Sequence, residues 1–205
     1  MKKPPKLDLY KLHKAEYAAT LKPALIELKP AVYLAISGQG APGGEQFSVS
    51  VGALYAVAFT IKMTRKFAGE QDYAVCKLEG QWWTKHESDF ANQPRDQWRW
   101  QLLIRTPDFV GEVDLRQAVA VLLKRGKGKN LQQVRLESLA EGQCVQMLHV
   151  GPYDRECETI ALMQAFAEKK QLKFLGRHHE IYLSDPHRVP PERLKTILRH
   201  PVQPI

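Results

Sequence analysis

Two side chains near the C-terminal end of the sequence could handle protons from one rigid element. Glu180 and Tyr182 are separated by one residue within 178–184, a run that predicts a β-strand. Side chains alternate between the two faces of a strand, so we expect these two to share a face. A partly desolvated carboxyl group suits general acid or base work, and a phenol can donate to a developing anion. The alternatives are a carboxylate in bulk water or paired with Arg177, and an ordinary half-buried strand tyrosine.

Four tryptophans crowd two consecutive predicted strands, 73–84 and 98–106. Trp98 and Trp100 should share a face, whereas Trp82 and Trp83 should point to opposite faces. Flat aromatic walls hold planar or cationic ligands, each contact contributing roughly 0.5–2 kcal/mol. We expect Trp83 and Trp100 to line a ligand cavity in preference to the other two. The alternative for all four is an ordinary place in a sheet, where aromatic residues are common.

Four further residues are candidates for the walls of the same cavity. Tyr55 and Phe59 lie one turn apart in a predicted helix over 46–67. Met147 and His149 share a face of a predicted strand. The alternatives are plain core positions for Tyr55 and Phe59 and a structural role for His149.

No metal or cofactor motif stands out. His178 and His179 are adjacent on a strand, so they point to opposite faces and cannot chelate one ion together. The Gly-rich loop over 38–44 lacks the glycine spacing and the Gly-Lys-Ser/Thr ending of nucleotide loops. We therefore expect neither a metal nor an organic cofactor, and no serine or cysteine occupies a recognisable nucleophile motif.

Composition narrows the class of partner and the compartment. The 205 residues are 44% hydrophobic and carry a formal net charge of +8. Much of the excess lies at the front of the chain and in 124–129, where solvated tails and loops are expected, so nucleic acid is an unlikely main partner. Three widely spaced cysteines indicate a reduced, cytoplasmic setting. The uncharged stretch over 46–61 is too short to span a bilayer, and we expect no membrane partner.

The order of predicted elements repeats. Residues 1–29 form an accessory segment with a short helix around 9–21, and residues 30–205 form the main domain. Both halves of that domain, about 30–110 and 132–203, have the same predicted order of elements: a strand, a turn with glycine, a long helix and two strands. Between them, a helix is predicted over 114–124, with Asp114 starting a variant of the capping box. This pattern predicts an α+β fold of two units related by a pseudo-twofold axis, with helices covering antiparallel sheets and a ligand groove between the halves.

Short sequence motifs along nearly the whole chain resemble those of a known family. The sequence is similar to the stand-alone GyrI-like small-molecule-binding proteins of the SOUL/GyrI superfamily. The joint order and spacing of several phrases carry the resemblance: Ser37-Gly38-Gln39-Gly40-Ala41-Pro42, Leu54-Tyr55, Leu78-Glu79-Gly80-Gln81-Trp82-Trp83, Trp98-Arg99-Trp100, Arg105-Thr106-Pro107-Asp108-Phe109-Val110, His149-Val150-Gly151-Pro152-Tyr153-Asp154, His179-Glu180-Ile181-Tyr182-Leu183-Ser184-Asp185 and Lys195-Thr196-Ile197-Leu198-Arg199.

The resemblance implies a duplicated fold around a central aromatic cavity. Multidrug-sensing regulators with this module meet aromatic or cationic drugs with a buried glutamate, which matches Glu180 here. Some stand-alone members are cyclopropanoid cyclopropyl hydrolases, which open the strained ring of DNA-alkylating natural products with water. In that activity Glu180 and Tyr182 would position and activate the water. The alternatives are a non-catalytic drug-sequestering protein and an interaction protein with a gyrase-type partner. No DNA-binding segment is recognisable, which argues against a complete transcription regulator.

Overall fold

A computed structural model describes residues 5–84 and 94–205. Within these residues the strands form one antiparallel sheet in the order β1-β6-β9-β8-β3-β4-β2-β5, with β7 paired to β9. The strands are β1 (Ala24–Leu28), β2 (Ala31–Gln39), β3 (Glu79–Trp83), β4 (Arg99–Arg105), β5 (Arg135–Leu139), β6 (Gly142–Val150), β7 (Leu172–Phe174), β8 (His178–Tyr182) and β9 (Lys195–Pro204). The helices are α1 (Leu9–Leu12), α2 (Lys14–Tyr17), α3 (Glu45–Phe67), α4 (Glu112–Lys124) and α5 (Glu156–Lys169).

The strand order confirms the predicted duplication. The run β6-β9-β8 is mirrored by β2-β4-β3, and the two halves meet where β8 pairs with β3. In that central pair Gly80 lies opposite Glu180, and Trp82 lies opposite His178. The seam between the two repeats therefore runs alongside the strand that carries the candidate site.

The outermost strands are exchanged between the halves. β1 precedes β2 by two residues yet pairs with β6, and β5 precedes β6 by two residues yet pairs with β2. Such short links hold the two ends of the sheet close together, so the sheet curls around one of its faces. The N-terminal accessory segment thus supplies a strand of the sheet as well as the short helices.

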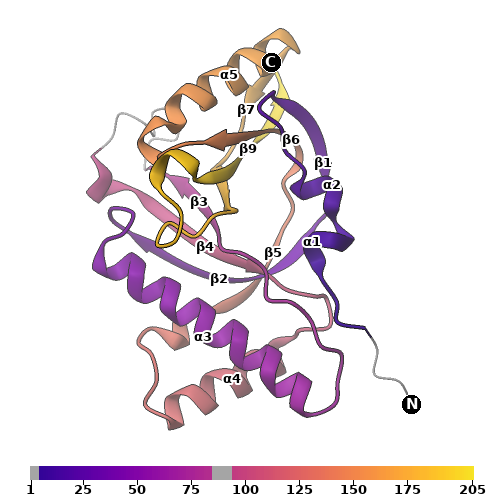
Figure 1. Ribbon diagram of the computed structural model, residues 1–205, viewed down its shortest axis with the longest axis vertical. Helices are drawn as coiled ribbons and strands as arrows, with labels where there is room; N and C mark the ends of the chain where they lie inside the picture. The colour runs from indigo at the N-terminus through magenta and orange to yellow at the C-terminus, as the bar shows by residue number, and fades with distance from the viewer. Residues whose placement is uncertain (1–4, 85–93) are drawn as a thin grey trace.

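Two helices cover the outer face of the curled sheet, one over each half. α3 packs on β2 and β4 through residues such as Leu54, Ile61 and Leu102. α5 packs on β6 and β9 through Met163 and Ala167, which are fully buried, and through Ile160 and Phe166, which are partly buried. Figure 1 shows α5 at one end of the sheet and α3 with α4 at the other. The outer face of β3 and β8 lies between these two cores.

Three element boundaries differ from the predictions. Only Glu79–Trp83 of the predicted strand over 73–84 pairs in the sheet. The predicted N-terminal helix is two short ones that end at Tyr17. α4 begins at Glu112, so Asp114 does not start the helix; it lies in the first turn, and its carboxylate accepts the N–H of Gly111 at 3.0 Å. The capping interaction is therefore made three residues earlier than predicted, because Gly111 takes the cap position.

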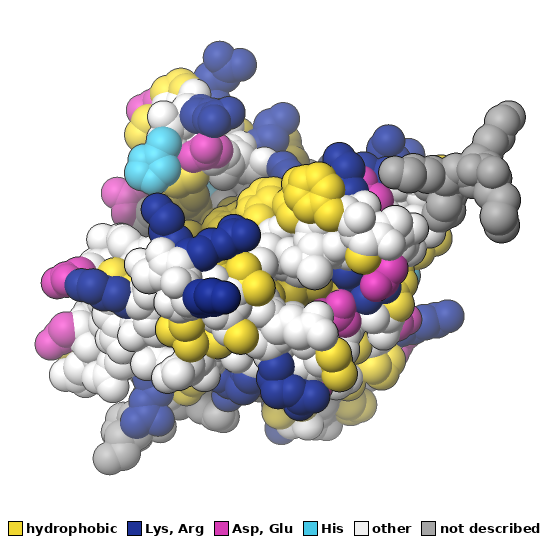
Figure 2. Space-filling view, turned by 90° about the horizontal axis from the view of Figure 1, so that it is seen from below, with side chains coloured by type: hydrophobic (Ala, Val, Ile, Leu, Met, Phe, Trp, Pro, Cys, Tyr) yellow, Lys and Arg dark blue, Asp and Glu magenta, His cyan; other side chains and the backbone are white. Residues whose placement is uncertain are grey.

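α3 is the one helix in the described ranges that is long and apolar enough, by length and composition, to cross a membrane. Its buried positions face the sheet within the main core: Ser50, Ala53, Leu54, Val57, Ala58 and Ile61. Figure 2 shows the face of the molecule at this end, with hydrophobic side chains among scattered Lys and Arg side chains. Packing on the sheet accounts for the apolar side of α3.

Candidate functional site

The candidate site lies on the outer face of β8 and β3. Glu180 and Tyr182 share this face, as predicted, and His178 shares it too. The register places Gly80 beside Glu180 and Trp82 beside His178. From the far side, Glu156 enters from the first turn of α5. Both repeats therefore contribute, with β3 from the first and α5 and β8 from the second.

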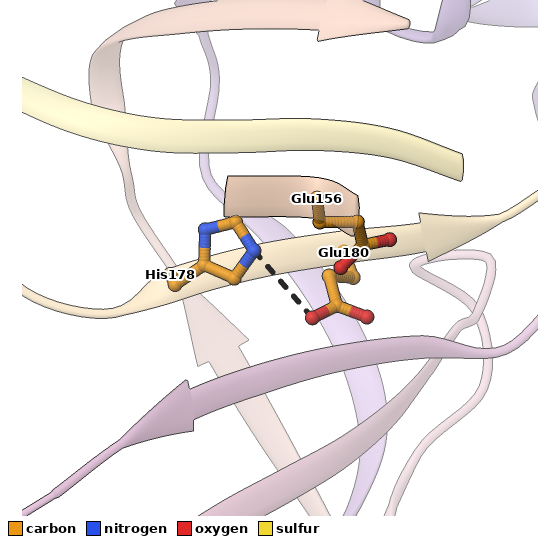
Figure 3. A group of neighbouring side chains, drawn as sticks. All are labelled: Glu156, His178 and Glu180. Carbon is orange, nitrogen blue, oxygen red and sulfur yellow. Dashed lines mark ion pairs between the residues drawn. The ribbon is translucent and has the colours of Figure 1, made fainter. Parts of the chain in front are cut away.

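Polar side chains gather around Glu180. The indole Nε1 of Trp82 donates to the hydroxyl oxygen of Tyr182 at 3.1 Å, and Tyr182 shares the face of Glu180. Glu156 offers a carboxylate oxygen within 4.8 Å of a Glu180 oxygen, and Nε2 of His178 lies 3.5 Å from a Glu180 oxygen. Figure 3 shows the two carboxyl groups next to each other with the imidazole beside them. Glu180 thus lies at the centre of this group.

The neighbours of Glu180 hold their protons. Burial, and then the negative charge of Glu180, raise the pKa of Glu156 well above its usual range. Burial, and then the negative charge of Glu180, raise the pKa of the Tyr182 hydroxyl in the same way. Tyr153, whose ring meets that of Tyr182 edge-on at 6.0 Å, has its pKa raised to about 12, first by burial and then by the charge of Glu180. We infer that Glu156 carries its proton.

The three residues Glu156, His178 and Glu180 could also offer ligands to a metal ion. One atom from each lies within 4.8 Å of the other two, and all three side chains are buried. A proton on Glu156 removes one of the two negative charges that would attract a cation. We therefore interpret the group as a carboxyl pair with a proton on Glu156, and the expectation that the protein uses no metal stays a prediction.

Aromatic residues surround Trp82 rather than Trp83. The ring of Trp82 stacks on Phe47 at 5.7 Å and meets Trp98 edge-on at 5.9 Å. Trp83 lies on the opposite face of β3, where the guanidinium of Arg177 covers its ring at 3.8 Å. Trp83 and Glu180 are therefore not brought together. The sequence favoured Trp83 and Trp100 over Trp82 and Trp98 as lining residues, but it is Trp82 that contacts the site.

Trp100 shares the face of Trp82 but lies in the core. Its side chain is fully buried, with Phe47 edge-on at 5.5 Å and the backbone of Gly38 against its six-membered ring. This packing accounts for its burial without a ligand. Its role in a cavity stays a prediction.

The remaining predicted lining residues lie in two places. Tyr55 and Phe59 stack on α3 at 6.1 Å, with Phe59 half exposed. Met147 and His149 border a hollow at the end of β6, away from Glu180. Nδ1 of His149 lies 2.8 Å from the hydroxyl of Thr159, and Nε2 lies 3.2 Å from the carbonyl oxygen of Pro152. These contacts correspond to the structural role that we gave as the alternative for His149. Glu180 does not line this hollow.

Sequence reasoning missed Glu156 and the part played by His178. The i, i+2 spacing of His178 and Glu180 was a usable signal, because it places both on one face. Glu156 gave no signal of its own, since acidic residues are ordinary in the first turn of a helix. Only the packing of α5 on β6 and β9 shows that its side chain turns inward.

The opposite, inner face of the same strands carries a separate buried network. His179 places Nδ1 2.9 Å from Glu141 and Nε2 3.1 Å from Glu79. Arg199 reaches Glu141 at 3.5 Å, and the hydroxyl of Tyr17 donates to Glu79 at 3.2 Å. The alternation of strand faces, which ruled out joint chelation by the two histidines, sends them into two different clusters. We assign the inner cluster to the stability of the fold.

Comparisons with known proteins agree with this architecture. The family of the GyrI-like small molecule binding domain matches residues 21–203. A conserved protein from Listeria innocua of uncharacterised function is 40% identical with a TM-score of 0.90, and a hydrolase from the same organism is 40% identical with a TM-score of 0.89. Each comparison covers 97% of this chain and 100% of the other.

More distant structures share the fold alone. The C-terminal domain of EcmrR is 12% identical with a TM-score of 0.58, over 90% of this chain and 98% of that domain. A search of curated proteins gives no match. The family match over most of the chain, with the two-repeat sheet and its covering helices, shows that this chain belongs to the GyrI-like small-molecule-binding family.

Proposed function

We propose that this protein binds bulky aromatic small molecules between its two halves and adds water to the strained ring of cyclopropanoid alkylating compounds. The observation that carries the proposal is the set of protonated groups, Glu156 and Tyr182, that converge on Glu180. Such a set offers a base and an acid, and ring opening by water uses both. The likeness to a Listeria hydrolase at 40% identity supports the same reaction class.

Ring opening of an activated cyclopropane needs two proton movements. The oxygen of water bonds to the ring carbon, the strained C–C bond breaks, and its electron pair moves into the conjugated carbonyl. The water must lose a proton and the carbonyl oxygen must gain one. In the proposed reaction Glu180 takes the first proton, and Tyr182 or Glu156 supplies the second. The sum is addition of one water molecule, with no redox change.

A second function has a specific observation in its favour. Glu180 is buried and shares a face with Trp82, whose ring packs against Phe47 and Trp98. In a sequestering protein Glu180 would serve only as a counter-charge for a cationic aromatic ligand. We also propose that the protein acts in detoxification and that it is cytoplasmic. A gyrase-type protein partner is a further proposal.

Mass spectrometry after incubation with a cyclopropanoid alkylator tests the proposal. We expect a ring-opened product heavier by one water, formed over many turnovers, and a rate about 100-fold lower in Glu180→Gln. Glu158→Gln is the matched control, because Glu158 lies on the same helix as Glu156 but is exposed and paired with Arg155. It should keep the full rate.

Two results would count against catalysis. Unchanged compound bound in a one-to-one complex would favour sequestration. Hydrated product formed equally by Glu180→Gln would remove Glu180 from the reaction. A thermal melt of each variant separates loss of the site from loss of the fold.

A further inference from the structure

We propose that the same site also hydrolyses aryl-substituted epoxides to vicinal diols. This inference rests on the proposed function, because both activities use Glu180 as the base and its protonated neighbours as acids. It extends the substrate class from a strained carbon ring to a strained ring that contains oxygen.

The compactness of the site favours an epoxide. Atoms of Glu156, His178 and Glu180 lie within 4.8 Å of one another, and Tyr182 follows Glu180 by two residues on the same face of β8. In an epoxide, the carbon that water attacks is bonded to the oxygen that must be protonated. In an activated cyclopropane, the proton goes to a carbonyl oxygen several bonds away from the attacked carbon. An acid and a base on neighbouring positions of one strand face therefore match the epoxide more closely.

Tyr182 is placed to act as the acid. Its hydroxyl oxygen receives the N–H of Trp82 at 3.1 Å, which stabilises the negative charge that forms when the proton leaves. The Tyr182 hydroxyl lies against the backbone of Gly80, in the space that a side chain would fill. A Cβ at Gly80 would lie 2.8 Å from the Tyr182 oxygen. Tyr153, with its ring edge-on to Tyr182 and partly exposed, places a second phenol next to the site.

The proposed reaction balances and returns the site to its starting state. The oxygen of water bonds to one epoxide carbon while the C–O bond of that carbon breaks. Glu180 takes a proton from the water, and Tyr182 gives its proton to the leaving oxygen, so the product is a diol. The proton on Glu180 then passes to the Tyr182 phenolate, its neighbour on the same face of β8. Water is the only co-reactant.

The surrounding side chains favour an aryl substituent. Trp82, Phe47 and Trp98 pack against each other beside Tyr182, and Phe47 and Trp98 are only partly buried. An aromatic substituent stacked on such rings gains roughly 0.5–1.5 kcal/mol for each contact beyond the area that it buries. An alkyl epoxide lacks this gain.

Styrene oxide and trans-stilbene oxide in water labelled with ¹⁸O test the proposal with the full-length protein. We expect diol with one labelled oxygen, a rate at least about 100-fold lower in Tyr182→Phe and in Glu180→Gln, and slower turnover of 1,2-epoxybutane. Tyr73→Phe is the matched control, a buried tyrosine of the main core outside the site. It should keep the wild-type rate.

The outcomes separate this inference from the proposed function. Hydration of the cyclopropanoid with no diol from either epoxide overturns the epoxide activity and leaves the proposed function standing. Diol formation without cyclopropanoid hydration overturns the proposed hydration of cyclopropanoids and leaves the epoxide activity standing. Diol formed at the wild-type rate by Tyr182→Phe that melts normally would overturn the role given to its hydroxyl.

Discussion

Replacing His179 by asparagine should lower the free energy of unfolding by about 3–5 kcal/mol, because it removes the cation that two buried carboxylates share. Both ring nitrogens of His179 contact carboxylates, Glu141 on one side and Glu79 on the other. The side chain is fully buried, so water cannot replace the lost partner. Urea unfolding followed by fluorescence measures the loss, and His187→Asn, at an exposed histidine, should change it by less than about 0.5 kcal/mol.

The same network predicts how stability depends on pH. Burial alone would lower the pKa of His179, but Glu141 and Glu79 raise it to about 9 from 6.5. A histidine with a raised pKa contributes its full stability below the unfolded value, and this contribution is lost as the pH rises through the folded value. The free energy of unfolding should therefore fall by about 3 kcal/mol between pH 6.5 and pH 9.5.

At acidic pH the free energy of unfolding should change with pH in the opposite direction. Burial alone would raise the pKa of Glu141, but the charge of His179, with help from Arg199, lowers it to about 2. Stability from this interaction is present above pH 4.5 and is lost as the pH falls toward 2. The difference between wild type and His179→Asn isolates the network from all other groups that titrate. A difference that stays constant from pH 6 to pH 9.5 would contradict the charged pair.

Much of the fold follows from local sequence patterns. Alternation over 178–184 places Glu180 and Tyr182 on one face, and helical spacing predicts the long helix over 46–67. The repeated order of elements predicts two similar halves, and the mirrored strand order confirms them. These features depend on periods of a few residues, which a sequence displays directly.

Other features depend on which distant segments meet. No local pattern shows that β1 pairs with β6 rather than with β2, or that Glu156 turns toward Glu180. Alternation separated Trp82 from Trp83 correctly, yet it could not tell which of their two faces carries Glu180. That choice is made by the register of β3 against β8, which is a tertiary property.

Gly38→Ala should destabilise the protein by about 3 kcal/mol, at the upper end of the usual cost of overpacking a core. A Cβ at position 38 would lie 2.3 Å from the ring of Trp100, which is the cross-strand partner of Gly38. The ring cannot withdraw easily, because it is fully buried and Phe47 packs against it. Either the indole leaves its place or β2 separates from β4, and both changes disturb the core under α3.

Gly52→Ala is the matched control within the same half of the molecule. Gly52 lies in the middle of α3, and a Cβ there would meet nothing within 4 Å. Alanine is the better helix former, so this variant should gain about 0.5–1 kcal/mol. Chemical denaturation of both variants, with tryptophan fluorescence as the signal, should therefore show changes of opposite sign. Equal stability of Gly38→Ala and wild type would mean that Trp100 does not occupy the space above Gly38.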